Sequence, residues 1–345
     1  MTLNWFEQLM GFSESDYLTT QRRLVVDGDT LTSTVNGKSY GIGQLSLPTL
    51  AELRTSAPNP SGRRTTVTSI VGDVRKLHAD PTLRGALFQV ASQFNLLEMT
   101  HPTVTPEQGV ARYAGDHTQG PACAIAAGAA TIYRNYGVAV GGRTGQTATH
   151  QLDALAHMGS ALSAALADPV SKLWTMHNGY AACTGAGLRA ITDLLDGATA
   201  EQRDDLRGTL AIGLHRNVEV TDVRSKDQFV SQAYCSALPV AYYRSNGDWE
   251  AFARLVLESA YEATLLAASQ QASTGGSNIV LLTRLGGGAF GNDDAWIDDA
   301  MMRALRIVEH AALDVRIVSY GQPNASVRAI IDQWTRRSPH DVAPR

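Results

Sequence analysis

The residues with the most distinctive chemistry lie near the C-terminus, where glycines follow a short apolar run. The run itself, Ile279 to Leu282, predicts a buried strand. Shortly after it come small residues and one aromatic: Gly286, Gly287, Gly288, Ala289, Phe290 and Gly291. Asn292 and the aspartates after it offer N-cap side chains for a following helix. Glycine lets backbone N–H groups approach a phosphate, and a helix N-terminus favours negative charge. The segment therefore predicts an anion cradle.

The spacing Gly286-x-Gly288-x-x-Gly291 also matches the fingerprint of dinucleotide-binding domains. That fold needs an acidic residue at the end of the next strand, where it holds a ribose hydroxyl. Here the next predicted strand ends in Ser319-Tyr320-Gly321, and Asp314 lies before it. We therefore reject a dinucleotide domain. A plain strand-to-helix turn is the other alternative, but consecutive glycines are entropically costly, so we favour the anion site.

Carboxylates and an amide mark a second candidate site in the middle of the chain. The run Ala86 to Ala91 predicts a strand, and Asn95 and Glu98 follow it. The ends of strands are where open α/β sheets place ligand contacts. Glu107 follows a predicted helix start, and Asp116 precedes another. Taken singly, such residues are also typical of a turn cap, a solvated carboxylate and a helix cap.

The helix start after Asp116 is a second candidate anion site. Gln119 and Gly120 precede Pro121, which suits a first helical turn. The helix dipole should keep a carboxylate at this end ionised. Small residues predict that the helix, which we expect over 122–136, lies close to a sheet.

Composition bounds the class of protein. The 345 residues are 44% hydrophobic and 18% charged, as in soluble globular proteins. A net charge of -4 without a basic run argues against a nucleic-acid partner. No apolar run suits a membrane span, and the N-terminus lacks a secretion signal. Three scattered cysteines suit a reducing compartment. We expect a cytoplasmic protein with no membrane partner.

The predicted elements alternate between strand and helix, which indicates a layered α/β sandwich around a mixed sheet. A hairpin is expected over 24–35 and a glycine-rich connection over 137–147. The principal helices are expected over 105–114, 122–136, 150–166, 184–195, 249–268, 296–310 and 327–334. The principal strands are expected over 66–70, 86–91, 210–214, 279–282 and 315–319.

Several segments, in this order, resemble the macrodomain superfamily, and most of all its atypical ADP-ribosylarginine hydrolases of bacterial-effector type. The segments are QFNLLEM, YAGDHTQGPACA, VSQAYCSALPVAYY and LGGGAFGN with SYG. One difference is that typical macrodomains carry a Gly-Gly-Gly-Val loop soon after the asparagine. Here Glu107-Gln108-Gly109-Val110 and then Asp116 to Gly120 stand in its place. This acidic first loop resembles that of poly(ADP-ribose) glycohydrolases.

The resemblance implies a three-layer α/β/α sandwich with a mixed central sheet and helical and N-terminal additions. It places an N-terminal extension over residues 1–65 and the ADP-ribose-binding catalytic domain over 66–335. A helical insertion is expected around 140–207.

The resemblance further implies an ADP-ribosyl hydrolase that removes mono-ADP-ribose from arginine, with the modified protein as partner. A carboxylate near the glycosidic carbon would stabilise the oxocarbenium-like state or orient water, and we assign this role first to Asp116, then to Glu98 and Glu107. Asn95 would hold ribose hydroxyls. Gln119, Gly120 and the segment from Gly286 to Asn292 would hold the diphosphate, with Phe290 over the distal ribose.

Two alternatives stay open at this stage. Tyr320 would stack on adenine, although an aromatic at a strand end is as often part of the core edge. The chain would serve as a non-catalytic ADP-ribose reader if the acidic residues were not catalytic. No Cys/His spacing indicates zinc, and nothing indicates Mg²⁺ although carboxylates can bind it, so we expect neither a metal nor a cofactor.

Overall fold

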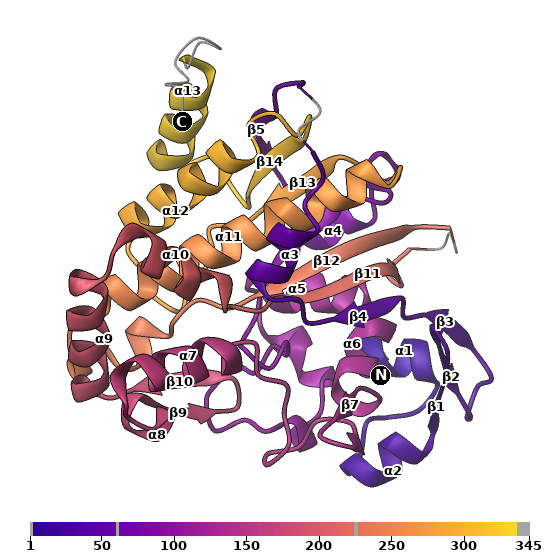
Figure 1. Ribbon diagram of the computed structural model, residues 1–345. Coiled ribbons are helices and arrows are strands. Elements are labelled where there is room, and N and C mark those ends of the chain that lie inside the picture. The colour runs from indigo at the N-terminus through magenta and orange to yellow at the C-terminus, as the bar shows by residue number, and fades with distance from the viewer. Residues whose placement is uncertain (1–2, 60–61, 224–226, 337–345) are drawn as a thin grey trace.

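A seven-stranded mixed sheet forms the centre of the protein, whose computed structural model describes residues 3–59, 62–223 and 227–336 (Figure 1). In spatial order its strands are β4 (Gln44–Ser46), β11 (Gly213–Glu219), β12 (Phe229–Cys235), β6 (Leu87–Ala91), β13 (Ile279–Leu282), β14 (Asp314–Ser319) and β5 (Thr66–Val71). The strands from β12 to β5 are parallel, and β11 is antiparallel to β12 and β4. The predicted mixed sheet is therefore confirmed.

Helices cover both faces of the sheet, as the sequence predicts for a three-layer sandwich. One layer contains α4 (Val74–His78), α5 (Gln119–Ala126) and α6 (Gly128–Tyr136). The other contains α3 (Leu50–Thr55), α11 (Glu250–Ser273) and α12 (Asp294–Ile307). Helix α13 (Ala325–Arg336) packs against β5 at the sheet edge. Helix α11 is buried on most of its surface because α3, α9 (Gly185–Gly197), α10 (Ala200–Gly208) and α12 surround it.

The N-terminal segment builds a second, smaller apolar core. It contains α1 (Trp5–Met10), α2 (Tyr17–Arg22) and a sheet of β1 (Leu24–Asp27), β2 (Thr30–Ser33) and β3 (Ser39–Gly41). The predicted hairpin is thus present. Phe6 and Met10 share this core with Leu97 and Tyr113 from the middle of the chain. The segment also supplies β4 to the central sheet, and the boundary at residue 65 stays a prediction.

A lobe of helices and hairpins lies between α6 and β11, over the stretch where the sequence predicts a helical insertion. The hairpin of β9 and β10 turns at Asn178 and Gly179, both of which have a positive φ. The elements of the lobe are β7 (Ala139–Val140), β8 (Arg143–Thr144), α7 (Ala156–Leu166), α8 (Val170–Leu173), β9 (Trp174–His177), β10 (Tyr180–Cys183), α9 (Gly185–Gly197) and α10 (Ala200–Gly208).

The prediction of a helix over 105–114 is wrong. Two short 3-10 turns occupy this stretch, η2 (Pro106–Gln108) and η3 (Ala111–Gly115). Between them Gly109 has a φ of +82°, a left-handed conformation that ends the first turn. The carboxylate of Glu14 then accepts the N–H groups of Val110 and Ala111, which a continuous helix would use internally.

The helix predicted over 122–136 is present but broken at Ala127. Thr221 causes the break, because its hydroxyl accepts the N–H of Gly128 at 2.9 Å. Its own N–H donates to the carbonyl of Ala126 at 2.8 Å. The remaining short turns are η1 (Pro81–Leu83), η4 (Val240–Tyr242) and η5 (Arg244–Asn246).

Candidate active site

The sheet opens where β6 and β13 end. These parallel strands pair only at Val280 with Leu87 and at Leu281 with Phe88. Beyond this point the side chain of Gln119 takes the place of a neighbouring strand. Its Oε1 accepts the N–H of Ala91, and its Nε2 donates to the carbonyl of Gln89, both at 2.9 Å. The split strands therefore leave a crevice with satisfied backbone groups at the carboxyl edge of the sheet.

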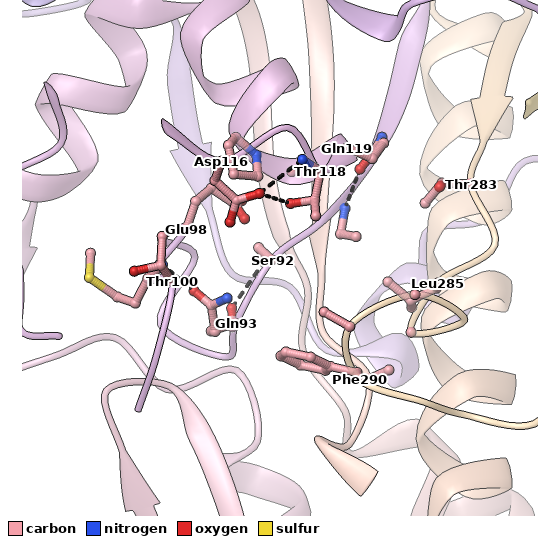
Figure 2. A pocket seen from close by; sticks show the side chains of 18 of the residues that line it. Ser92, Gln93, Glu98, Thr100, Asp116, Thr118, Gln119, Thr283, Leu285 and Phe290 are labelled. Carbon is pink, nitrogen blue, oxygen red and sulfur yellow. Dashed lines mark hydrogen bonds between the residues drawn. The ribbon is translucent and has the colours of Figure 1, made fainter. Parts of the chain in front are cut away.

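A cavity of about 160 Å³ lies in this crevice (Figure 2). The loops after β6, β12 and β13 form it together with the segment that leads into α5. Its lining residues are Ala91, Ser92, Gln93, Glu98, Met99, Thr100, Asp116, Thr118, Gln119, Gly120, Pro121, Tyr180, Ala237, Tyr242, Thr283, Arg284, Leu285, Gly286, Gly288, Ala289 and Phe290. Two segments that the sequence identifies as sites, far apart in the chain, thus share one cavity.

Glu98 is a buried carboxyl in the wall of the cavity, with only 3% of its surface exposed. Its Oε1 has no hydrogen-bond partner among the described residues. Burial raises the pKa of Glu98 well above its usual range, because the charged form loses solvation; the cation of Arg134 opposes this shift, and the charge of Asp116 adds to it. Glu98 is therefore suited to carry a proton that a ligand in the cavity can receive.

Gly120 fits closely against Glu98. A Cβ at this position would lie 2.1 Å from the carbonyl oxygen of Ala91 and 2.2 Å from Oε2 of Glu98. Only glycine lets the first turn of α5 approach both groups.

Asp116 is half-buried and differs from Glu98 in its surroundings. Its Oδ1 accepts the N–H of Thr118 at 2.9 Å and the hydroxyl of Thr118 at 2.7 Å. Thr118 is the N-cap of α5 and makes no side-chain cap bond, so Asp116 orders the residue before the helix and does not cap the helix directly. Figure 2 shows Asp116 and Glu98 on the same side of the cavity, with Phe290 across from them.

A buried guanidinium supports the loop that carries Glu98. Arg134 is fully buried and donates from Nε to the carbonyl of Leu96 at 3.1 Å. Leu96 has a φ of +64°, which is unusual for a branched residue. The guanidinium also bonds Thr131 at 2.9 Å and lies 3.9 Å from the ring centroid of Tyr234. These contacts fix the sharp turn two residues before Glu98.

The glycine loop forms the opposite wall. Its turns are closed by the N–H of Gly287 on the carbonyl of Arg284, and by the N–H of Gly291 on the carbonyl of Gly288. Within the described ranges, the N–H groups of Gly288, Ala289 and Phe290 have no acceptor. Such donors in a glycine turn suit an anion.

Aromatic rings line the cavity beside this loop. The rings of Tyr180 and Phe290 are 5.3 Å apart, and Tyr242 lies 5.2 Å from Tyr180 and 5.9 Å from Phe290. The hydroxyl of Tyr180 donates to the carbonyl of Met99 at 2.5 Å, which ties the β9–β10 lobe to the loop of Glu98.

Several predicted site residues do not line the cavity. Asn95 is buried, and its side chain bonds Gln151 at 2.8 Å and the N–H of Leu97 at 3.1 Å. Glu107 accepts the N–H of Ala148. The roles predicted for Asn95 in ribose binding and for Glu107 in catalysis stay predictions.

Four other predicted site residues lie near the cavity but do not line it. Gly287 and Gly291 lie in the glycine loop, and Asn292 donates to the carbonyl of Leu238 at 2.8 Å beneath it. Tyr320 follows β14 at the same sheet edge and is 85% exposed.

Sequence reasoning missed Gln93, Thr100, Tyr180, Tyr242 and Arg284 as lining residues. The sequence pattern over 229–243 predicts one long extended or buried segment that includes Tyr242. In the structure, β12 ends at Cys235, and the turn η4 places Tyr242 in the cavity wall. The break at Pro239 was the available signal. Tyr180 follows the Asn178-Gly179 turn, but nothing local links that hairpin to the site.

The described residues contain no group of three or more His, Cys, Asp or Glu side chains placed to hold a metal ion. In the same ranges, no helix has the length and apolar character needed to cross a bilayer.

No sequence model of a known family matches the chain, and no curated protein sequence matches it significantly. Among solved structures, it is similar to poly(ADP-ribose) glycohydrolase from Thermomonospora curvata, with 12% identity, a TM-score of 0.43, and coverage of 91% of this chain and 94% of that chain. The inhibitor-bound form (ADP-HPD) gives 13% identity, a TM-score of 0.40 and the same 91% and 94% coverage. Poly(ADP-ribose) glycohydrolase from Deinococcus radiodurans in complex with ADP-ribose gives 12% identity, a TM-score of 0.43, and coverage of 85% of this chain and 94% of that chain.

Proposed function

We propose that the protein is an ADP-ribosyl hydrolase that releases ADP-ribose from modified protein side chains, with arginine as the acceptor. The observation that carries this proposal is the pair of unlike carboxyl groups, buried Glu98 and half-exposed Asp116, in the wall of one cavity. Hydrolysis of a glycosidic bond uses two such groups, one as acid and one as base or charge stabiliser.

The rest of the cavity suits the other parts of ADP-ribose. The free N–H groups of the glycine loop and the N-terminus of α5 favour a diphosphate. Phe290 and Tyr242 line the same cavity and are available to pack against the ribose next to the carboxyl groups. Tyr320, exposed at the same sheet edge, is available to stack on adenine.

The proposed reaction assigns a separate task to each carboxyl group. Asp116 accepts a proton from a water molecule whose oxygen bonds to the glycosidic carbon, and its charge stabilises the oxocarbenium-like state. The bond from this carbon to the guanidine nitrogen breaks, and its electron pair stays on nitrogen. Glu98 gives that nitrogen its proton. The products are ADP-ribose and unmodified arginine, and proton exchange with solvent restores both carboxyl groups.

The choice of arginine rests on the sequence resemblance to ADP-ribosylarginine hydrolases and not on a contact in the cavity. The test is incubation with peptides that differ only in the ADP-ribosylated acceptor, with release followed by chromatography. We expect release from arginine and little from serine. Equal rates on both, or release from serine alone, would reject arginine specificity and leave hydrolysis standing.

Asp116→Asn provides the matched test of mechanism. The amide keeps the shape and removes the charge, so ADP-ribose binding should stay within about tenfold, or roughly 1.4 kcal/mol. Turnover should fall by about 100-fold or more. Calorimetry and kinetics on one preparation, with circular dichroism as the fold control, decide the matter. Wild-type turnover in this variant would leave Asp116 with only its bond to Thr118. ADP-ribose binding without hydrolysis of any linkage by the wild type would identify a reader.

A further inference from the structure

We infer that Glu14, in the N-terminal segment, is a positioning residue that holds both Asp116 and Glu98 in place through the turn η3. This inference rests on the proposed function, and no local feature of the sequence around Glu14 indicates it. Glu14 lies in the link between α1 and α2, outside the central sheet and outside the cavity.

Both oxygens of the Glu14 carboxylate are used at the start of η3. Oε1 accepts the N–H of Val110 at 2.9 Å and the hydroxyl of Tyr136 at 2.8 Å. Oε2 accepts the N–H of Ala111 at 2.7 Å. A single carboxylate thus fixes two successive peptide groups against helix α6.

From η3, one residue reaches both candidate catalytic groups. Tyr113 is fully buried, and its carbonyl accepts the N–H of Asp116 at 3.1 Å. Its hydroxyl accepts the N–H of Glu98 at 3.0 Å. A shift of η3 would therefore move the backbone of both residues together.

Two further features are built around this contact. Gly109 has a φ of +82°, and a Cβ there would lie 2.3 Å from Oε2 of Glu14, so glycine is required for the carboxylate to approach. The indole Nε1 of Trp5 donates to the carbonyl of Ala111 at 3.2 Å, a further bond from the N-terminal segment to η3.

Glu14→Gln tests the inference, because an amide of the same shape puts an NH₂ group among the N–H and O–H donors that the carboxylate accepts. Turnover should fall by about 10-fold to 100-fold, the usual result of misplacing a reacting group. ADP-ribose affinity should stay within about threefold, since the glycine loop is untouched. The matched control is Glu7→Gln, whose carboxylate accepts the N–H of Asn4 and the hydroxyl of Ser13 within the same segment. That variant should keep turnover within about twofold.

A double-mutant cycle separates positioning from general loss of stability. In the Asp116→Asn background, Glu14→Gln should lower turnover by clearly less than it does in the wild type, because only Glu98 remains to be positioned. The same fall in both backgrounds would overturn the inference.

Hydrogen exchange of residues 109–118 gives a readout that needs no activity. Glu14→Gln should speed exchange at Val110, Ala111 and Asp116, and Glu7→Gln should not. Unchanged exchange in Glu14→Gln overturns the inference whether or not the wild type is a hydrolase. If Glu14→Gln exchanges faster and the wild type hydrolyses nothing, the structural role of Glu14 is supported and only the proposed function is rejected.

Discussion

At the scale of single residues, the site depends on how differently two acidic side chains are surrounded. Glu98 is buried from solvent, and one of its carboxyl oxygens has no hydrogen-bond partner among the described residues. Asp116 is partly exposed to solvent and accepts hydrogen bonds from the N–H and the hydroxyl of Thr118. Under the proposed function, this difference would make Glu98 the proton donor and Asp116 the proton acceptor.

The raised pKa of Glu98 predicts an alkaline limit to activity. A general acid works only while it is protonated. Turnover should therefore persist above pH 4.5, the ordinary pKa of a glutamate, and fall as the pH rises through the raised pKa of Glu98. Glu98→Gln keeps the volume but cannot donate a proton, so it should lose about 100-fold of turnover and the alkaline limit with it. The pH profile of turnover checks this. A Glu98→Gln enzyme with the wild-type profile would contradict the assignment.

The sequence predicts the type of these residues but not their environments. Asp116 and Glu98 were recognisable as carboxylates near strand and helix ends. Their difference depends on Arg134, Gly120 and the N-terminal core, which are distant in sequence from one or both of them. The bonding of Asn95 to Gln151 is equally invisible, since the partner comes from the inserted lobe.

At the scale of elements, the order of strand β13, glycine loop and helix α12 agrees with the order that the sequence predicts. The strand and the loop were predictable because each follows from local preferences. The helix predicted over 105–114 fails because a carboxylate from residue 14 competes for its N–H groups. Local preference is a poor guide wherever a distant side chain takes over the backbone bonds.

The loop provides a test of the anion cradle. Gly288 lines the cavity, its φ is not left-handed, and a Cβ there would meet no atom within 4 Å. Gly288→Val should therefore fold normally while its methyl groups fill the space proposed for the diphosphate, and ADP-ribose binding should weaken by more than about 100-fold. Gly197→Val, equally free of contacts at the end of α9, should bind as the wild type does. Calorimetry decides, and unchanged affinity in Gly288→Val would remove the cradle from this loop.

An ion-pair network joins the helices that cover one face of the sheet. Glu262 on α11 is 2% exposed and pairs with Arg54 of α3 at 2.6 Å and with Arg303 of α12. Glu262→Gln removes the buried carboxylate and leaves Arg54 and Arg303 only their shared ion pairs with Asp204, so the variant should cost about 2 kcal/mol of unfolding free energy. Glu250→Gln, which breaks an exposed pair with Arg254, should cost less than about 0.5 kcal/mol. Urea unfolding compares the two, and similar costs would show that the network is not stabilising.

At the scale of the whole molecule, the free energy of unfolding should decrease at acidic pH, because the fold disfavours the protonated form of a core histidine. His78 is fully buried, stacks on Phe88 at 3.8 Å and bonds the carbonyl of Val74 at 2.8 Å. Burial lowers the pKa of His78 from 6.5 to about 4. Below pH 6.5 the unfolded chain therefore binds a proton that the folded protein does not, so stability falls as pH is lowered towards 4.

From this shift, we expect His78 to account for roughly 3 kcal/mol of lost unfolding free energy between pH 7 and pH 4. His78→Gln cannot take up the proton, so its stability should decline less over the same interval even if it starts lower. Urea titrations of both proteins at several pH values give the comparison. Parallel declines would show that His78 is not the titrating group.

The amide of Gln119 between the diverging strands has a consequence for the kinetics of binding. Because it already holds the N–H of Ala91 and the carbonyl of Gln89, the crevice is open before a ligand arrives. Entry breaks no bond between strands, so little binding free energy is diverted into rearrangement. Association should then be a single bimolecular step, limited by encounter and orientation, and differences in affinity among related ligands should reside in how slowly each departs.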